Sequence, residues 1–141
     1  MCLVYKMLLI LPDREIIQEY LKQPDYKYLR ALAAFYLRLT EPHKKVYLGL
    51  EPYLKDFRKL RFRDPDGRYK IIHMDEYIDW LLTMESVFEI NLPFLPKRYN
   101  LEEQGKLQER PEYAVEKPKE ENKSVGRLTF KGQPKVEDTK P

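Results

Sequence analysis

The sequence predicts a mainly α-helical protein: a compact domain of five or six helices with one small β-hairpin, followed by a disordered tail. Apolar side chains recur at helical spacing through most of residues 1–103, which indicates amphipathic helices. Two short alternating runs flank a Pro-Asp-Gly turn near residue 66, which indicates a hairpin. After residue 103 the chain becomes rich in Lys and Glu and poor in large apolar residues, so residues 104–141 are assigned to the tail.

The first three predicted helices differ in how much of their surface is apolar. Residues 3–11 are read as a core helix and not as a signal peptide, because Lys6 interrupts the apolar run and no small-residue cleavage site follows. A second helix follows Asp13, its expected N-cap, and one of its faces carries Ile16, Ile17, Tyr20 and Leu21. The third helix, residues 25–39, is apolar almost all round and is therefore expected to be central.

The second half of the domain alternates helices with the hairpin. A fourth helix opens at residues 40–42, and Pro52, which lacks an N–H, is expected to kink it or to begin a new one. The hairpin occupies residues 60–72. The helix that begins near Met74 has an apolar stripe of Met74, Tyr77, Ile78, Leu81, Leu82 and Phe88. A last short element ends near Leu101.

Composition excludes several classes of protein. A net charge of +3 is too small to indicate nucleic-acid binding by overall charge, so only local clustering of basic residues is informative. The single cysteine, Cys2, cannot form an internal disulfide or a zinc site, which favours a reducing compartment. No apolar stretch approaches the roughly 20 residues that a membrane span needs, and we expect no membrane association.

The residues that usually carry catalysis are sparse. His43 and His73 are the only histidines, and neither is flanked by a nucleophile. No glycine-rich loop is present that could hold a phosphate. The adjacent carboxylates Asp75 and Glu76 point in different directions on a helix. We therefore expect no enzymatic activity, no cofactor and no metal site.

Basic residues gather around the predicted hairpin. Residues 55–70 contain seven Lys or Arg against three Asp, with Phe57, Phe62 and Tyr69 between them. One interpretation is RNA contact, in which basic residues hold the backbone and an aromatic stacks on a base. The candidate contacts are Arg58, Arg61, Arg63, Arg68 and Lys70. The alternative is that Phe62 and Tyr69 both face the core and the basic residues form a solvated surface.

Three further residues are candidates for protein interaction. Arg30 and Arg38 share one face of the central helix on either side of the small Ala34, where they could meet a partner or form internal salt bridges. Trp80 lies away from the apolar stripe of its helix, so it is either an interface anchor or covered by a loop or by the tail.

Four collinear segments resemble the pre-mRNA-splicing factor 38 family. They are DYKYLRALAAFYLRLT (25–40), YLGLEPYLKDFRKL (47–60), IHMDEYIDWLL (72–82) and LPFLPKRY (92–99). The resemblance covers residues 2–103 and corresponds to the C-terminal part of the family domain.

The resemblance implies a helical scaffold or adaptor without enzymatic activity that works in the nucleus. It implies association with the tri-snRNP and a requirement in spliceosome activation. The implied partners are a microfibrillar-associated protein, a zinc-finger splicing factor and other tri-snRNP components, with RNA contact only inside the assembly. The alternatives are a small RNA-binding protein that uses the basic hairpin 55–70, or a truncated fragment without function.

The chain departs from the family pattern in three ways. The N-terminal part of the family domain is missing, which is expected to expose core surface on the helices at 3–11 and 29–39. Trp80 stands where an acidic or polar residue is expected. The tail mixes Lys, Glu and Pro instead of carrying Arg-Ser repeats or a long acidic run.

Overall fold

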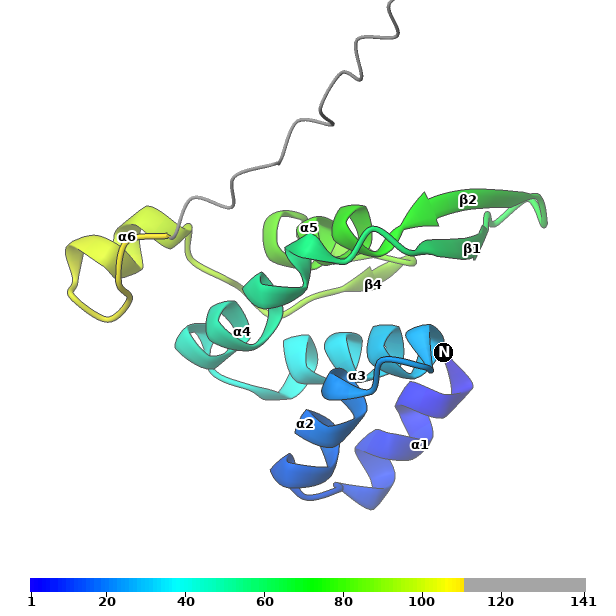
Figure 1. Cartoon of the computed structure of the whole chain (residues 1–141), viewed down its shortest axis with the longest axis horizontal. Helices are drawn as coiled ribbons and strands as arrows, with labels where there is room; N and C mark the ends of the chain where they lie inside the picture. Colours follow the sequence, from blue (N-terminus) through cyan, green and yellow to red (C-terminus); the bar gives the residue numbers. More distant parts are fainter. Residues whose placement is uncertain (111–141) are drawn as a thin grey trace, which may run out of the picture.

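A computed structural model of the chain describes residues 1–110 and confirms the predicted fold class (Figure 1). In chain order the elements are α1 (Cys2–Ile10), α2 (Arg14–Lys22), α3 (Lys27–Thr40), α4 (His43–Leu50), the 3-10 helix η1 (Glu51–Lys55), β1 (Lys59–Arg63), β2 (Tyr69–His73), α5 (Met74–Thr83), β3 (Ser86–Val87), β4 (Ile90–Asn91) and α6 (Arg98–Glu103). The predicted change of direction at Pro52 is the start of η1.

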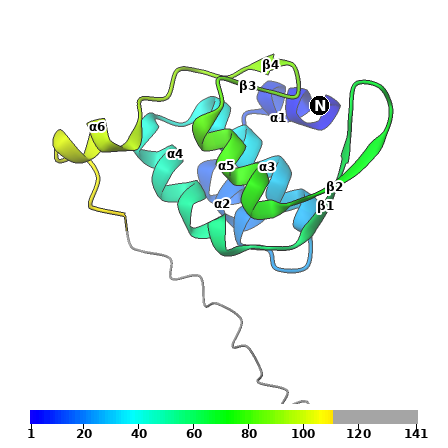
Figure 2. The same cartoon turned by 90° about the horizontal axis from the view of Figure 1, so that it is seen from above.

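Helix α3 is the centre of the domain, as predicted. It packs against α1 and α2 on one side and against α4 and α5 on the other (Figures 1 and 2). The side chains of residues 33–38 are all buried. Ala33 and Ala34 are fully covered, and their small side chains let neighbouring helices approach closely. The expected exposure of core surface on residues 29–39 is therefore wrong.

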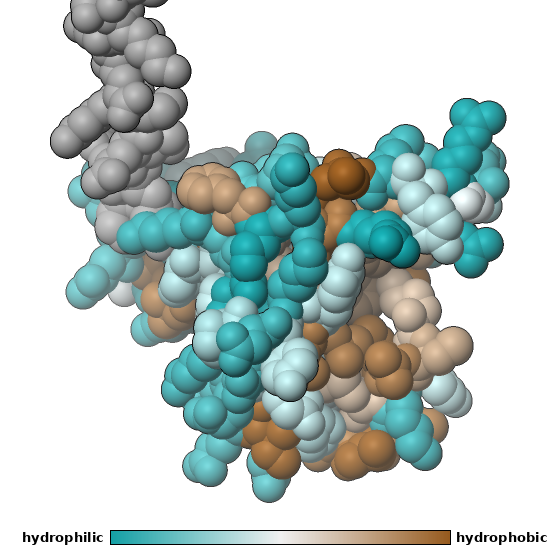
Figure 3. Space-filling view, turned by 45° about the vertical axis from the view of Figure 1, so that its right-hand side comes forward, coloured by the Kyte–Doolittle hydropathy of each residue, from teal (hydrophilic) through white to brown (hydrophobic). Residues whose placement is uncertain are grey.

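Helix α1 is correctly predicted as a helix, but most of it is not core. Val4 alone is buried, with Met7 partly buried against the same cluster. The exposed apolar side chains are Leu3, Tyr5, Leu8, Leu9, Ile10 and Leu11. Hydrophobic patches are visible on the lower part of the face in Figure 3. The expected exposure of this helix is confirmed. At α2, Asp13 occupies the N-cap position, but its side chain makes no capping hydrogen bond.

The predicted hairpin is present, and it settles which way its aromatic side chains point. Strands β1 and β2 are antiparallel, with Leu60 opposite Ile72 on the buried face. Gly67 takes a φ of +80° in the connecting turn, a conformation that favours glycine. Phe62 faces the core, as expected, but Tyr69 is exposed. The expectation that both aromatics point inward is therefore wrong for Tyr69.

A second, two-residue hairpin between β3 and β4 was not predicted. Helix α5 ends at Thr83, so Phe88 does not belong to the stripe of that helix. It lies in the β3–β4 turn, where Phe88 and Glu89 have φ values of 54° and 64°. The Phe88 ring stacks on Phe62 and Tyr77, with centroids 5.5 and 5.8 Å apart. These contacts offset the cost of placing two non-glycine residues in the left-handed region.

Replacing Glu89 with glycine is expected to raise the free energy of unfolding by about 1 kcal/mol, because glycine adopts this φ without a Cβ clash. Glu89 is exposed, so the change removes no packing. Thermal denaturation of wild type and Glu89→Gly measures the effect. Glu89→Ala removes the same carboxylate but keeps the Cβ, so an equal gain in that variant would contradict the explanation by backbone strain.

The C-terminal end of the described chain is held by a small second cluster. Leu101 of α6 and Leu107 are buried against Tyr47 of α4. The Tyr47 hydroxyl donates to the Pro96 carbonyl oxygen at 2.8 Å, and Arg98 is ion-paired with the buried Glu51. Packing thus continues past residue 103, where the sequence predicted the domain to end. The disordered tail was predicted to begin at residue 104. Residues 104–110 of that segment are described and include the buried Leu107, whereas residues 111–141 lie outside the described part of the chain.

Candidate interaction surfaces

The described part of the chain offers no group of side chains suited to metal binding. Within residues 1–110, His, Cys, Asp and Glu side chains nowhere gather in groups of three or more that could hold a metal ion. His43 packs edge-on against Phe94, with ring centroids 6.4 Å apart. His73 is the N-cap residue of α5, and its backbone N–H donates to Glu76 Oε2 at 2.9 Å. Both histidines therefore have local structural contacts.

Arg38 crosses the core to the end of a neighbouring helix. Its side chain is only 3% exposed. Its Nε donates to the Leu81 carbonyl oxygen at 2.8 Å, and its Nη2 donates to the Pro93 carbonyl oxygen at 2.7 Å. Leu81 lies in the last turn of α5, where carbonyl groups lack partners within the helix and where a cation is favoured by the helix dipole. Burial lowers the pKa of the guanidinium.

Arg30 likewise donates hydrogen bonds to carbonyl oxygens at the C-terminal end of α2. Its guanidinium donates to the carbonyl oxygens of residues 21, 22 and 23 and to Asp56 Oδ2, the last at 2.7 Å. Asp56 also accepts from Arg58, whose Nη2 lies 2.7 Å from the same oxygen. Burial raises the pKa of Asp56, but hydrogen bonds from Arg58 and Arg30 outweigh it and lower the pKa to about 2. Both α3 arginines thus stabilise helix ends inside the domain. The geometry favours the internal salt bridge for Arg30, which pairs with Asp56, whereas Arg38 is held within residues 1–110 by backbone carbonyl oxygens and not by an acid.

Trp80 is half-buried on α5. Its ring meets Phe62 of the hairpin edge-on, with centroids 6.0 Å apart and an interplanar angle of 78°. The tryptophan therefore borders the aromatic cluster formed by Phe35, Phe62, Tyr77 and Phe88. The part of its ring that stays accessible is available to a partner.

The hairpin separates the five basic residues singled out in the sequence. Arg61 and Arg63 lie on the outward face of β1, and Arg68 is exposed in the turn. Lys70 lies on the opposite face and pairs with Asp64 at 2.5 Å. Arg58 is held by Asp56 and by the Pro24 carbonyl oxygen. Arg61, Arg63 and Arg68 are therefore the residues of this set that remain accessible as a group.

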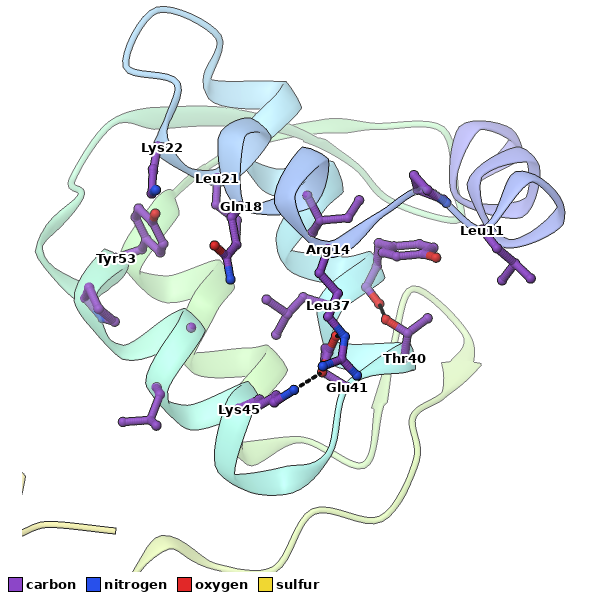
Figure 4. A pocket seen from close by; sticks show the side chains of 16 residues that line it. Leu11, Arg14, Gln18, Leu21, Lys22, Leu37, Thr40, Glu41, Lys45 and Tyr53 are labelled. Atoms are coloured by element: carbon purple, nitrogen blue, oxygen red, sulfur yellow. Dashed lines mark hydrogen bonds and ion pairs between the residues drawn. The ribbon is translucent and has the colours of Figure 1, made fainter. Parts of the chain in front are cut away.

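A groove of about 700 Å³ lies between α2, the end of α3, α4 and η1 (Figure 4). Its floor is apolar and includes the buried Ile17, Leu21 and Leu37. Gly49 of α4 faces Leu37, and a Cβ at this position would lie 3.0 Å from Leu37 Cδ1. Glycine thus lets α3 and α4 approach while the groove stays open. Leu48, 55% exposed, lies on the rim.

The rim of the groove is charged. Glu41 is held between Arg14 at 2.9 Å and Lys45 at 3.7 Å. Glu41 Oε2 is buried and accepts no hydrogen bond from residues 1–110. An apolar floor beside a rim of paired charges suits a protein segment that carries apolar anchors within a polar surround. Sequence reasoning missed this groove, although a glycine inside the α4 pattern was a signal of close helix approach.

Comparisons with known proteins agree along the chain. The family model for the PRP38 family matches residues 1–105 of the chain. The chain is 51% identical over 102 residues to pre-mRNA-splicing factor 38 of Schizosaccharomyces pombe, covering 72% of this chain and 48% of that protein. It is 47% identical over 110 residues to pre-mRNA-splicing factor 38 of Arabidopsis thaliana, covering 78% and 31%. The chain thus spans less than half the length of these curated relatives.

A solved structure shares the fold at high sequence identity. A chain in the crystal structure of the Snu23–Prp38–MFAP1(217–258) complex of Chaetomium thermophilum has 46% sequence identity to this chain and a TM-score of 0.74. The match covers 77% of this chain and 57% of the other.

In residues 1–110, every helix is too short or too polar to cross a bilayer.

Proposed function

The chain belongs to the PRP38 family, and from this membership we propose that it is a non-catalytic adaptor protein of pre-mRNA splicing. The observation that carries the proposal is the match of residues 1–105 to the family, together with the structural likeness to a chain of a splicing-factor complex. The proposed setting is the nucleus, in association with the tri-snRNP at spliceosome activation. Affinity purification of the tagged chain from nuclear extract tests this setting. Recovery of tri-snRNP proteins with spliceosomal small nuclear RNAs supports it, and recovery of neither from soluble protein contradicts it.

The proposed partners are counterparts of the two proteins in the solved complex. MFAP1 is the microfibrillar-associated protein that the sequence resemblance implied, and Snu23 fits the zinc-finger splicing factor. MFAP1 enters that complex as the fragment 217–258. A segment of this length is too short to bury a core of its own, so it gains stability by laying apolar side chains into a partner's groove.

We propose that the α2–α4 groove, defined by the residues around Ile17, Leu37 and Gly49, receives the MFAP1-type segment. The floor offers apolar surface, and the paired charges of Arg14, Glu41 and Lys45 give the groove a polar rim. Leu48 stands at the rim with an exposed side chain, so it can be changed with little effect on folding.

Leu48→Glu is expected to weaken binding of the MFAP1-type segment about tenfold, because it places a charge against the apolar side chains of the segment. Isothermal titration of the full chain with a synthetic peptide that corresponds to fragment 217–258 measures the effect. Ile71→Glu is the matched control: Ile71 is also an exposed aliphatic residue, 68% accessible, but it lies on the hairpin away from the groove. Equal losses in both variants, or no loss in Leu48→Glu, would contradict docking in the groove.

A further inference from the structure

We propose that the outward face of the β1–β2 hairpin binds single-stranded RNA, with Tyr69 stacking on a base and Arg61 and Arg63 contacting phosphates. This binding activity goes beyond the adaptor function proposed above. The choice of RNA over single-stranded DNA rests on that function, whereas the surface itself is read from the hairpin geometry.

The positive charge of the chain is concentrated in this hairpin. Residues 59–73 carry five basic and two acidic side chains, a net charge of +3, which is the net charge of the whole chain. The remainder of the sequence is therefore neutral overall. Within residues 1–110, Arg61, Arg63 and Arg68 form no ion pair, while Asp64 is engaged by Lys70 on the other face. The outward face thus keeps its positive charge for a ligand.

The strand register places an aromatic ring among these charges. Arg63 lies directly opposite Tyr69, and Arg61 lies opposite Ile71 on the same face. The Arg61 guanidinium carbon is 5.6 Å from the centre of the Tyr69 ring. Two residues along a strand correspond to about 7 Å, so Arg63 lies directly across from Tyr69 and Arg61 lies diagonally across, both on the neighbouring strand. Figure 3 shows hydrophilic side chains gathered over this hairpin.

Tyr69 is not part of the buried core, and its ring contacts Arg61 on the outward face of the hairpin. Its side chain is 64% exposed, whereas Phe62 on the opposite face of the hairpin is packed on Phe88 and Trp80. A solvent-facing aromatic beside two arginines matches the way in which proteins bind single strands, where aromatics stack on bases and basic side chains follow the backbone. An acidic protein segment would use the charges but would leave the ring without a function.

Addition of a peptide strand to the β1 edge is disfavoured, because a backbone N–H group on this edge is already hydrogen-bonded within the domain. At this edge the backbone N–H of Arg61 already donates to the Tyr28 hydroxyl oxygen at 3.0 Å. Strand addition requires such edge N–H groups to be open. The side-chain surface of the hairpin, and not the β1 backbone edge, is therefore the part offered to a ligand.

The test is fluorescence anisotropy of a labelled 12-nucleotide oligouridylate titrated with the full chain at several salt concentrations. Tyr69→Ala is expected to weaken binding roughly tenfold, within the range found for loss of one stacked base. Arg61→Gln combined with Arg63→Gln is expected to weaken binding. Because each phosphate contact contributes about 0.7 to the slope of log K against log salt, loss of two contacts should reduce the magnitude of that slope by about 1.4.

Matched controls lie at the opposite end of the molecule. Tyr99→Ala removes another exposed tyrosine, 55% accessible, from α6, and Lys44→Gln with Lys106→Gln removes two exposed charges away from the hairpin. These variants are expected to bind like wild type. No RNA binding by the folded chain, equal losses in the controls, or equal competition by polyglutamate would overturn the proposal. Equal affinity for oligodeoxythymidylate would overturn the assignment to RNA.

The outcome separates this inference from the proposed adaptor function. The hairpin variants are expected to bind the MFAP1-type peptide with unchanged affinity, because the groove lies on other elements. If Leu48→Glu loses peptide binding but keeps RNA binding, the result supports docking in the groove and leaves the RNA-binding surface of the hairpin unaffected. Intact peptide binding without any RNA affinity would remove only the RNA-binding surface.

Discussion

Replacing Arg38 with methionine is expected to lower the free energy of unfolding by about 3–5 kcal/mol. Methionine fills similar apolar space but leaves the carbonyl oxygens of Leu81 and Pro93 buried without a donor. Each unsatisfied carbonyl costs about 1–3 kcal/mol, and the favourable interaction of a cation with the end of α5 is also lost. Since small domains hold about 5–15 kcal/mol in total, this change is expected to leave the protein marginally stable.

Urea denaturation followed by circular dichroism measures the Arg38 effect. Arg38→Lys is the informative control, because an ammonium keeps the charge but cannot place two separate donors as the guanidinium does. It is expected to fall between wild type and Arg38→Met. A loss below about 1 kcal/mol in Arg38→Met would show that water replaces the guanidinium at both carbonyls, contrary to the buried geometry.

Acidification is expected to remove about 2 kcal/mol of stability through Asp56, at 1.36 kcal/mol per pKa unit. Its pKa in the folded protein is about 2, below the ordinary value of 3.8. A carboxyl group with a lowered pKa stabilises the fold fully above its unfolded pKa, and this contribution is lost as the pH falls through the folded pKa. The loss should therefore begin near pH 4 and be complete below pH 2.

Asp56→Asn separates this contribution from general acid effects. At pH 7 the variant is expected to be about 2 kcal/mol less stable than wild type, since Arg30 and Arg58 lose their carboxylate. The difference should shrink as the pH approaches 2, where wild-type Asp56 is itself protonated. Urea denaturation at pH 7, 5, 4 and 3 measures it. A difference that stays constant over this range would mean that Asp56 contributes by shape and not by charge.

The sequence predicted most of the secondary structure because those signals are local. Apolar spacing revealed α2, α3 and α5, and the Pro-Asp-Gly turn revealed the β1–β2 hairpin. The β3–β4 hairpin has no local signal: Phe88 and Glu89 occupy a turn that usually selects Asn or Gly. Its stability comes from the aromatic contacts of Phe88 with residues far away in the sequence, and spacing cannot reveal such contacts.

The candidate sites were predictable to different degrees. The basic hairpin was visible because its charges are close in sequence, yet the direction of Tyr69 depends on the register, which only the structure gives. The groove is assembled from three separate segments around residues 11–22, 36–41 and 45–53, so no single run of sequence marks it. Arg30 and Arg38 stood out as charges on an apolar helix, but, apart from Asp56, their acceptors are backbone carbonyl groups, which carry no sequence signature.

The separate packing of α6 has a consequence for cooperativity. Leu101 and Leu107 belong to a cluster with Tyr47 that is distinct from the main core around Phe35, and one carboxylate, Glu51, anchors Arg98. A short segment held by so few contacts opens at a lower free energy than the central helices. Residues 98–107 are therefore expected to open and reclose as a unit of their own while α3 stays folded, and each opening would expose Tyr47 to solvent.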